Sequence, residues 1–233
     1  RSNENFKAIH VYKISNNELK EFQVDLDGKR VDDITLSSND SSIFTVSGIY
    51  GSSNNSGIEG IFIVRIDSKN DSVISRGMVP FSRDIVFQNL TDKQRDRAEQ
   101  RLLNRNSEPQ LYNYRLRDIY TQPDGTVLGS VEQYYVHRRV TYDNRTGVSS
   151  TIYYYYYDDI IAFKIGKSGQ FDWQKMIPKS QVSINDGGPF SSYASFVTDK
   201  RMCFVFNDNT RNYNDDGSFS QALNSNSIYS LNL

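Results

Sequence analysis

The feature of this sequence that most limits its fold is an internal repeat. Three six-residue segments align without gaps, and each has a basic residue before a final isoleucine: Ile9–Ile14, Ile61–Ile66 and Ile160–Ile165. A polar turn and a second strand-like run follow each copy, at 19–24, 73–79 and 171–177. Two more such runs precede the second and third copies, within 33–50 and 116–136. Because repeated antiparallel strand groups stack in series, the repeat predicts consecutive four-stranded meanders.

The local chemistry of the chain is also that of a β protein. Its 16 Tyr and 13 Phe lie largely in short runs with Val and Ile, and Asn, Asp, Ser and Gly bound these runs. Glycine can take the positive φ that a tight reversal needs. We therefore expect hairpin tips at three places: Asp27-Gly28, Pro123-Asp124-Gly125 and Ser168-Gly169.

One segment, 91–104, predicts a helix instead. Thr91 and Gln94 have the spacing of a capping box, in which each side chain bonds to the backbone of the other residue. Ala98, Leu102 and Leu103 then form a narrow apolar stripe in a charged run, which ends before Pro109. We expect a short helical insertion that lies on a β surface, not a second domain.

The fold class that fits these features is all-β, a β-propeller-like array of four-stranded antiparallel blades. We expect one such domain or fragment over 1–233, with about three to three and a half units. The expected units lie at about 6–26, 33–80, 114–179 and 192–233, the last with a turn at 199–200 and a third strand at 227–231. A β-sandwich and other antiparallel architectures are the alternatives. Since the chain begins and ends in what aligns as a third strand, the repeat predicts part of a longer protein with an open arrangement of sheets.

Parts of the last two units resemble known proteins. The runs 158–166, 171–179 and 206–209 are similar to propeller-like repeats in uncharacterised exported proteins of Bacteroidota-type bacteria. The Gly169 turn followed by Trp173 also resembles the blades of pyrroloquinoline-quinone-type propellers, in which the tryptophan docks between adjacent blades. The resemblance implies a propeller fold, a largely buried Trp173 and a secreted, periplasmic or cell-surface location. It implies no activity and, because the cofactor residues of quinoprotein dehydrogenases have no counterpart, no cofactor.

The charge balance limits the partners. The chain has 27 Lys+Arg and 28 Asp+Glu, a formal net charge of -1, which gives no electrostatic reason to bind nucleic acid. No apolar run approaches the roughly 18 residues of a membrane-spanning helix, so no membrane insertion is expected. Cys203 is the single cysteine, which excludes an intramolecular disulfide and a thiolate metal cluster.

Residues for catalysis are few. The two histidines, His10 and His137, lie in strand-like runs, where structural or surface roles are expected, and the sequence has no phosphate loop, paired-histidine helix motif or nucleophile elbow. A glycosidase needs only two carboxylates. Acids lie at or within predicted strands at five positions: Asp33, Asp118, Glu132, Asp158 and Asp159. The first two are expected to bond to nearby backbone or arginine. A carbohydrate-active hydrolase with a carboxylate-lined propeller face is therefore the alternative function.

Segment 212–218 has oxygen-bearing side chains at alternate positions before Gly217, as in the first half of a calcium loop. Leu223 stands where such a loop needs its bidentate glutamate. We therefore expect a polar solvated loop and assign no metal site, with weak calcium coordination as the alternative.

The feature that folding does not obviously require is a long hairpin from Tyr134 to Tyr157, bordered by tyrosines and with its tip at 143–147. Tyrosine offers a flat apolar ring with a polar tip, which suits sugars and protein surfaces alike. If the hairpin is a recognition element, we expect its contacts from four residues: Tyr135, Arg138, Tyr154 and Tyr156. The alternatives are that cross-strand tyrosine pairs only stiffen the hairpin, or that the hairpin packs on the helix expected at 91–104. The predicted function is a non-catalytic binding module of an exported bacterial protein, which recognises a glycan or protein partner through its loops.

Overall fold

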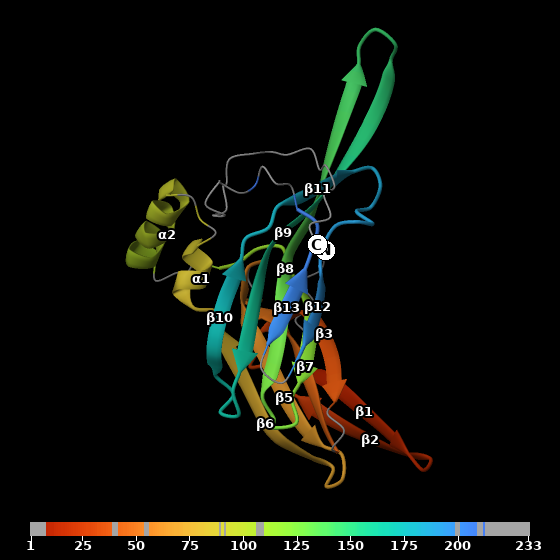
Figure 1. Ribbon diagram of the computed structural model, residues 1–233, viewed down its shortest axis with the longest axis vertical. Helices are drawn as coiled ribbons and strands as arrows, with labels where there is room; N and C mark the ends of the chain where they lie inside the picture. Colours follow the sequence, from red (N-terminus) through yellow and green to blue (C-terminus); the bar gives the residue numbers. More distant parts are fainter. Residues whose placement is uncertain are drawn as a thin grey trace. The chain divides into compact units, whose positions relative to one another are not determined.

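The computed structural model describes residues 8–38, 42–53, 56–88, 90, 92–105, 110–198, 201–208 and 212. The strands are β1 (Ile9–Ser15), β2 (Glu18–Val24), β3 (Arg30–Ser38), β4 (Ile43–Gly51), β5 (Ile58–Asp67), β6 (Ser72–Pro80), β7 (Tyr114–Thr121), β8 (Val127–Asp143), β9 (Val148–Ile165), β10 (Phe171–Ile177), β11 (Gln181–Ile184), β12 (Ala194–Val197) and β13 (Met202–Val205). The helices α1 (Arg83–Gln88) and α2 (Asp92–Arg105) lie between β6 and β7 in the chain (Figure 1). The predicted antiparallel, mostly β character is confirmed.

Contacts group the chain into two compact units. The first unit consists of residues 1–130 and 162–176, and the second of residues 131–161 and 177–233. The long strands β8 and β9 contribute residues to both units. The second unit holds most of the β8–β9 hairpin together with β11, β12 and β13, whereas the helices and the strands from β1 to β7 belong to the first.

The described strands form four sheets. Strands β3 to β6 form a meander in chain order, and β7 to β10 form a second meander, to which β11 is added by pairing with β9. These meanders correspond to the strand groups predicted at 33–80 and 114–179. The pairs β1–β2 and β12–β13 form two-stranded sheets. The turn predicted at 199–200 and the strand predicted at 227–231 lie outside the described residues.

The β1–β2 hairpin packs its apolar side on one face of the β3–β6 sheet. Phe22 and Val24 of β2 are buried in one hydrophobic cluster with Val46, Phe62 and Val64 of the sheet. The opposite face of the sheet is buried as well, because residues of both faces along β4 and β5 are inaccessible to solvent. The sheet therefore lies inside the first unit as a layer covered on both sides.

The turn at Asp27-Gly28 carries the chain from this hairpin into β3. Both residues have positive φ, 53° and 73°, as predicted for a tight reversal. The turn is nevertheless not a hairpin tip, because β2 pairs with β1 and β3 belongs to the other sheet. The tips predicted at 123–125 and 168–169 do join neighbouring strands of the second meander.

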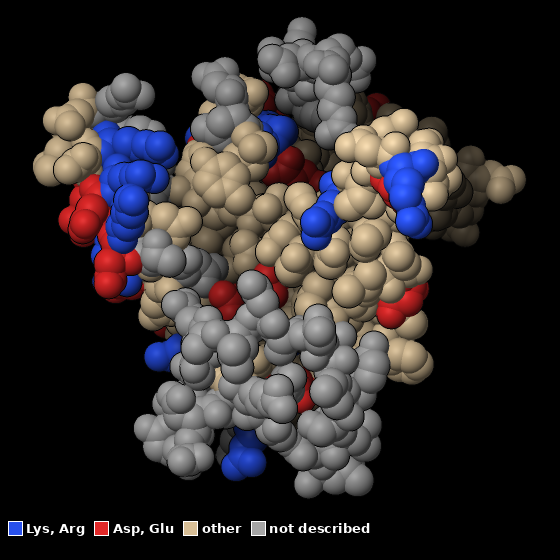
Figure 2. All heavy atoms as spheres, turned by 90° about the horizontal axis from the view of Figure 1, so that it is seen from above, with Lys and Arg blue, Asp and Glu red and all other residues tan. Residues whose placement is uncertain are grey.

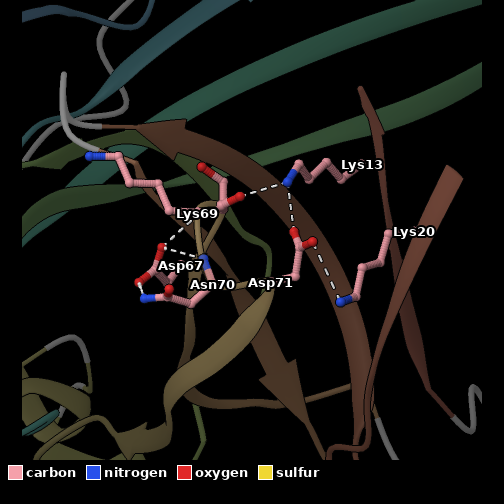
Figure 3. A network of polar contacts seen from close by, with 7 residues as sticks. Lys13, Lys20, Asp67, Lys69, Asn70 and Asp71 are labelled. Atoms are coloured by element: carbon pink, nitrogen blue, oxygen red, sulfur yellow. Dashed lines mark hydrogen bonds and ion pairs between the residues drawn. The ribbon is translucent and has the colours of Figure 1, made fainter. Parts of the chain in front are cut away.

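The repeated basic residues link consecutive repeats. Lys13 of β1 donates from Nζ to the Ser68 carbonyl oxygen and to Asp71 Oδ1, both at 2.6 Å, in the β5–β6 turn (Figure 3). Arg65 of β5 donates from Nη1 to the Lys167 carbonyl oxygen, at 3.4 Å, in the β9–β10 turn, and from Nη2 to the Gly125 carbonyl oxygen, at 2.7 Å, in the β7–β8 turn. Ser68 and Lys167 are equivalent, since each lies two residues after the final isoleucine of its copy. The basic residue of one repeat therefore binds the turn of the next.

The β5–β6 turn is shaped for this contact (Figure 3). Asp67 accepts the backbone N–H groups of Lys69 and Asn70 at 2.8 and 3.2 Å, and these bonds hold the pKa of its carboxyl below the usual range. The hydrogen bond from Lys13 lowers the pKa of Asp71 in the same way. Both carboxylates are therefore charged at neutral pH, and the turn presents an ordered acceptor to the β1–β2 hairpin.

Helix α2 matches the predicted segment 91–104, but the shorter helix α1 before it was not predicted. Thr91 and Pro109, the expected start and stop signals, lie outside the described residues. Trp173 lies on β10, the outermost strand of its meander, and its exposure is intermediate, so its deep burial between sheets stays a prediction.

Charged side chains of both signs lie on the face shown in Figure 2. On the face shown in Figure 2, Lys and Arg lie in small groups, and uncharged residues separate these groups. The described residues on this face form no extended area of a single sign, as expected for a chain with a net charge of -1.

Candidate functional site

The predicted tyrosine hairpin is formed by β8 and β9 in the second unit. Three cross-strand ring pairs join these strands, with centroid separations of 4.8, 4.6 and 6.2 Å: Tyr134–Tyr157, Tyr135–Tyr156 and His137–Tyr154. Each step forward along β8 is matched by one step back along β9, so the ring pairs share one antiparallel register. The cross-strand tyrosine pairing considered from the sequence is therefore present.

This register divides the predicted contact residues between two faces. Successive strand residues point to opposite sides, so Tyr135, Tyr154 and Tyr156 share one face, whereas Arg138 lies on the other. We call the side that carries these three tyrosines the Tyr156 face. Strand β11 extends it, because Ile184 pairs with Tyr154. Ile184 is 46% exposed, so this edge of the face is open to solvent.

An acidic residue ends the Tyr156 face. Asp158 follows Tyr156 by two positions on β9, which places its side chain on the same side of the sheet. The Tyr135 hydroxyl and the side chain of Ser180 form hydrogen bonds with this carboxyl group. Its Oδ1 is nevertheless buried without a hydrogen-bond partner among the described residues. The Tyr156 face therefore combines aromatic rings with one carboxylate oxygen that lacks a hydrogen-bond partner among the described residues.

The surroundings of Asp158 change the pH at which its carboxyl group ionises. Burial, and secondly the charge of Asp159, raise the pKa of Asp158 to about 6. Burial and the neighbouring Asp158 charge also raise the pKa of Tyr135, to about 12. The tyrosine is therefore a neutral donor across the physiological range, whereas Asp158 changes charge just below neutral pH.

A buried ion pair lies on the opposite side of the same strands. Lys179 Nζ is 2.9 Å from Glu132 Oε1, and both side chains are 0% exposed. Lys179 also donates to the Tyr157 carbonyl oxygen at 2.7 Å and to Gln181 Oε1 at 3.1 Å. The Ser192 hydroxyl donates to Glu132 Oε2 at 2.7 Å. Burial lowers the pKa of Lys179, and the facing Glu132 charge opposes that effect.

Asp159 belongs to the ion-pair side. Its Oδ1 accepts the backbone N–H of Lys179 at 3.0 Å, and burial raises its pKa. Because neighbouring strand residues point in opposite directions, Asp158 and Asp159 cannot flank one substrate on the same side of the sheet. The adjacent acids named from the sequence are thus separated by the strand itself.

The other acids and the histidines named from the sequence have local partners. Asp33 Oδ2 accepts the Leu116 N–H at 3.1 Å, and Asp118 accepts the Ser130 hydroxyl at 3.2 Å, both inside the first unit. His10 contacts Glu21 across the β1–β2 hairpin. Of the 212–218 segment only Asn212 is described, and its Nδ2 donates to the Ser180 carbonyl oxygen at 3.3 Å. Where side chains are described, no group of three potential metal ligands is found.

A groove of about 610 Å³ lies between the two helices of the first unit. Its walls combine both charges with apolar side chains: Arg83, Asp84, Phe87, Gln88, Arg95, Glu99, Leu102 and Leu103. None of the residues that the sequence singled out as contacts lines it.

Sequence reasoning missed Lys179 and β11. Lys179 follows Pro178 in a polar run, where a lysine is expected to be solvated. The signal that was available is the alternation in 181–184, in which Val182 and Ile184 are apolar. Four residues are too few to distinguish a strand from a loop by pattern alone, and the pairing with β9 is a long-range event.

We expect the Asp158→Asn variant to be more stable than the wild-type protein at neutral pH. The folded protein keeps the Asp158 proton up to about pH 6, whereas the unfolded chain loses it near 3.8. The stabilising contribution of this group is therefore complete below about pH 4 and is lost as the pH rises through 6. Asparagine is always neutral, so the free energy of unfolding should rise by about 2–3 kcal/mol at a pH of about 7.5, and by much less at about pH 4. Urea unfolding at both pH values measures the difference.

Asp143→Asn is the matched control for this measurement. Asp143 is exposed at the turn between β8 and β9, and a hydrogen bond from the Arg145 N–H holds the pKa of its carboxyl below the usual range. Asp143→Asn should therefore lower the free energy of unfolding at neutral pH, a change opposite in sign to that expected for Asp158→Asn. A variant at Asp158 that is no more stable than wild type at about pH 7.5 would show that the charge there is not costly.

Comparison of the chain with protein-family models, with curated proteins and with solved structures finds no match. In the described part of the chain, no helix is both long enough and apolar enough to cross a membrane.

Proposed function

We propose that this chain is a non-catalytic binding module that recognises a neutral glycan through the Tyr156 face. The observation that carries the proposal is Asp158, a partly buried carboxyl with one unpartnered oxygen beside three tyrosines that share its side of the sheet. A carboxylate kept where burial disfavours its charge is a feature of functional sites. The hydrogen bonds from Tyr135 and Ser180 and the charge of Lys179 favour the ionised carboxyl, but they do not outweigh the effect of burial, so the charge remains costly to the fold.

The chemistry of the face suits a sugar. Tyrosine rings pack against the apolar faces of flat rings, and the tyrosine hydroxyls add hydrogen bonds. The ionised Asp158 accepts hydrogen bonds, so it favours hydroxyl groups and repels anionic sugars. Tyr135 and Tyr156 stack on each other at 4.6 Å with planes 10° apart, and both side chains are partly exposed. A protein partner is the other ligand class that the sequence predicts, and a glycan screen separates the two.

The test is a glycan array with the full chain at a pH of about 7.5, followed by titration of the best neutral glycan. We expect Asp158→Asn and Tyr156→Ala each to weaken binding about tenfold or more, while the first variant gains stability. Binding to the wild-type protein should weaken below about pH 6, where Asp158 becomes neutral, and Asp158→Asn should lose this pH dependence. Arg138→Gln, on the opposite face, is the control and should bind normally. A chain that binds no neutral glycan, or variants that bind as wild type does, would refute the proposal.

A carbohydrate-active hydrolase is the second candidate, because a raised pKa is also the mark of a general acid. Such an enzyme needs a second carboxylate, so that the two carboxyl groups flank the scissile bond. The acid next to Asp158 in the chain, Asp159, lies on the other side of the sheet, and Glu132 is paired with Lys179. Release of reducing sugar from a bound glycan, abolished in Asp158→Asn, would favour the enzyme over the binding module.

We also propose that the meanders are blades of a propeller-like array in an exported bacterial protein. The support is the repeated contact in which Lys13 and Arg65 each bind the equivalent turn of the following repeat. A contact that recurs at equivalent positions gives successive sheets the same arrangement, as a blade array requires. The exported location rests on the sequence resemblance of 158–179 to repeats of exported proteins.

A further inference from the structure

We infer that the opposite side of the β8–β9 ribbon is a second, separate contact surface, which takes an anionic polysaccharide. We call this surface the Arg138 face. It consists of side chains that alternate with those of the Tyr156 face: Val136, Arg138, Val140, Tyr142 and Tyr153. The inference goes beyond the proposed function, which uses the other face and a neutral ligand.

The outer part of the ribbon consists of its own two strands. Strand β11 pairs with β9 from Tyr154 to Tyr157, and the hairpin continues beyond this stretch in Figure 1. The Thr141 hydroxyl donates to the Ser150 carbonyl oxygen at 3.4 Å, in the same register as the ring pairs nearer the base. That register places Arg138 directly opposite Tyr153. A cation and an aromatic ring therefore stand side by side on one surface.

The Arg138 face exposes apolar side chains that contribute little to folding. Four of them have large exposed fractions, 43%, 54%, 62% and 40%: Val136, Val140, Tyr142 and Tyr153. Single exposed apolar residues are ordinary, but four on one side of one hairpin form a continuous patch. A two-stranded ribbon gains little stability by itself, so ordering these residues is costly unless a ligand covers them.

The charge of the ribbon differs from that of the chain. Between His137 and Tyr153 there are three arginines and one acid, Asp143, which gives this segment a formal charge of about +2 against -1 for the whole chain. The Asp143 carboxylate already accepts the Arg145 N–H at 2.8 Å and the Thr146 hydroxyl at 2.9 Å. Within the described residues, Arg138 has no ion-pair partner, and the next arginine along β8, Arg139, points to the opposite side. The guanidinium group of Arg138 is therefore open to an anionic ligand on the Arg138 face.

The side chains of the Arg138 face together indicate the class of ligand that it binds. The guanidinium of Arg138 can bind a carboxylate or sulfate through two parallel hydrogen bonds. The Tyr153 and Tyr142 rings offer stacking surfaces for sugar rings, and the extended ribbon offers them in a line. Arg138 and Tyr142 lie four residues apart on the same face of β8, about 13 Å along the strand, which requires a ligand of several linked sugars. An acidic polysaccharide supplies the anion, the ring and the length together.

The test uses the full chain with polygalacturonate as the acidic probe and dextran as the neutral one, in calorimetric titrations at low and at moderate salt. We expect binding to polygalacturonate that weakens as salt is added. Arg138→Gln should weaken it about tenfold, Arg138→Glu should abolish it, and Tyr153→Ala should weaken it as well. These side chains are exposed, so the melting temperatures of the variants should match that of wild type.

The control is Arg76→Gln, which removes another exposed strand arginine, on β6, and should leave the affinity unchanged. Equal binding to dextran, or unchanged affinity in both Arg138 variants, would overturn the inference. Loss of polygalacturonate binding in Tyr156→Ala but not in Arg138→Gln would also overturn it, since the acidic ligand would then belong to the Tyr156 face. Binding to duplex DNA as strong as to polygalacturonate would overturn the choice of ligand class. The neutral-glycan screen tests the proposed function separately, so either proposal can fail alone.

Discussion

Replacing Lys179 by methionine is expected to lower the free energy of unfolding by about 3–5 kcal/mol. Lys179 and Glu132 are both 0% exposed and lie 2.9 Å apart, so neither charge has access to water. Methionine keeps most of the volume of the lysine side chain but removes the cation. Glu132 then remains as a buried charge without its cationic partner, although it keeps the hydrogen bond from the Ser192 hydroxyl, and the Tyr157 carbonyl oxygen loses its bond to Lys179 Nζ. Chemical denaturation at neutral pH measures the loss.

Two further variants separate the buried charge from simple loss of a side chain. Lys164→Met is the matched control, because Lys164 is 33% exposed and lies 3.4 Å from the more exposed Asp172. A pair of this kind contributes about 1 kcal/mol or less. Adding Glu132→Gln to Lys179→Met removes the uncompensated charge and should restore at least half of the lost stability. A loss for Lys179→Met no greater than for Lys164→Met would show that the buried pair does not stabilise the second unit.

The same ion pair shows what the sequence could and could not predict. The meanders were predictable because strand alternation and turn residues are local, and the repeat shows the same pattern twice. The burial of Lys179 was not, since it depends on β11 pairing with β9, which brings together residues distant in the chain. A polar residue after a proline carries no local signal of such an environment. Local sequence patterns therefore predict strands and turns, but not the pairing of strands that are distant in the chain.

The turn at Asp27-Gly28 shows a second limit. Its residue types predict positive φ, and the structure has it at both positions. Turn chemistry states that the chain reverses, but it does not state which strands then pair. Here the chain leaves a two-stranded hairpin and enters another sheet, so the reversal joins two layers instead of two neighbours.

The arrangement of the candidate contact residues could be predicted only in part. Strand alternation alone places Tyr135 and Arg138 on opposite faces, because they are three positions apart. The cross-strand partner of each residue, however, requires the register, which the ring pairs supply. Asp158 was named from the sequence as an acid within a strand. Its unpartnered oxygen and raised pKa could not be predicted, because both depend on how deeply the packed sheet buries the carboxyl group.

The Gly48→Ala variant is expected to lose about 3 kcal/mol of stability or more, although it adds a single methyl group. A Cβ atom at Gly48 would lie 2.2 Å from the Asp33 carbonyl oxygen and 2.3 Å from the Phe62 ring. Phe62 is 0% exposed, and the carbonyl belongs to the paired strand β3, so relief requires the sheet itself to shift.

Gly77→Ala provides the comparison within the same sheet. Its Cβ would lie 3.4 Å from the nearest atom, an ordinary contact, and its φ is not in the left-handed region. We expect a change within about 0.5 kcal/mol, as for most substitutions without a clash. Thermal unfolding of both variants gives the contrast. Similar melting temperatures for the two would mean that β3 and β5 move apart readily at Gly48, and the packing within the β3–β6 sheet would then be much softer than the buried Phe62 indicates.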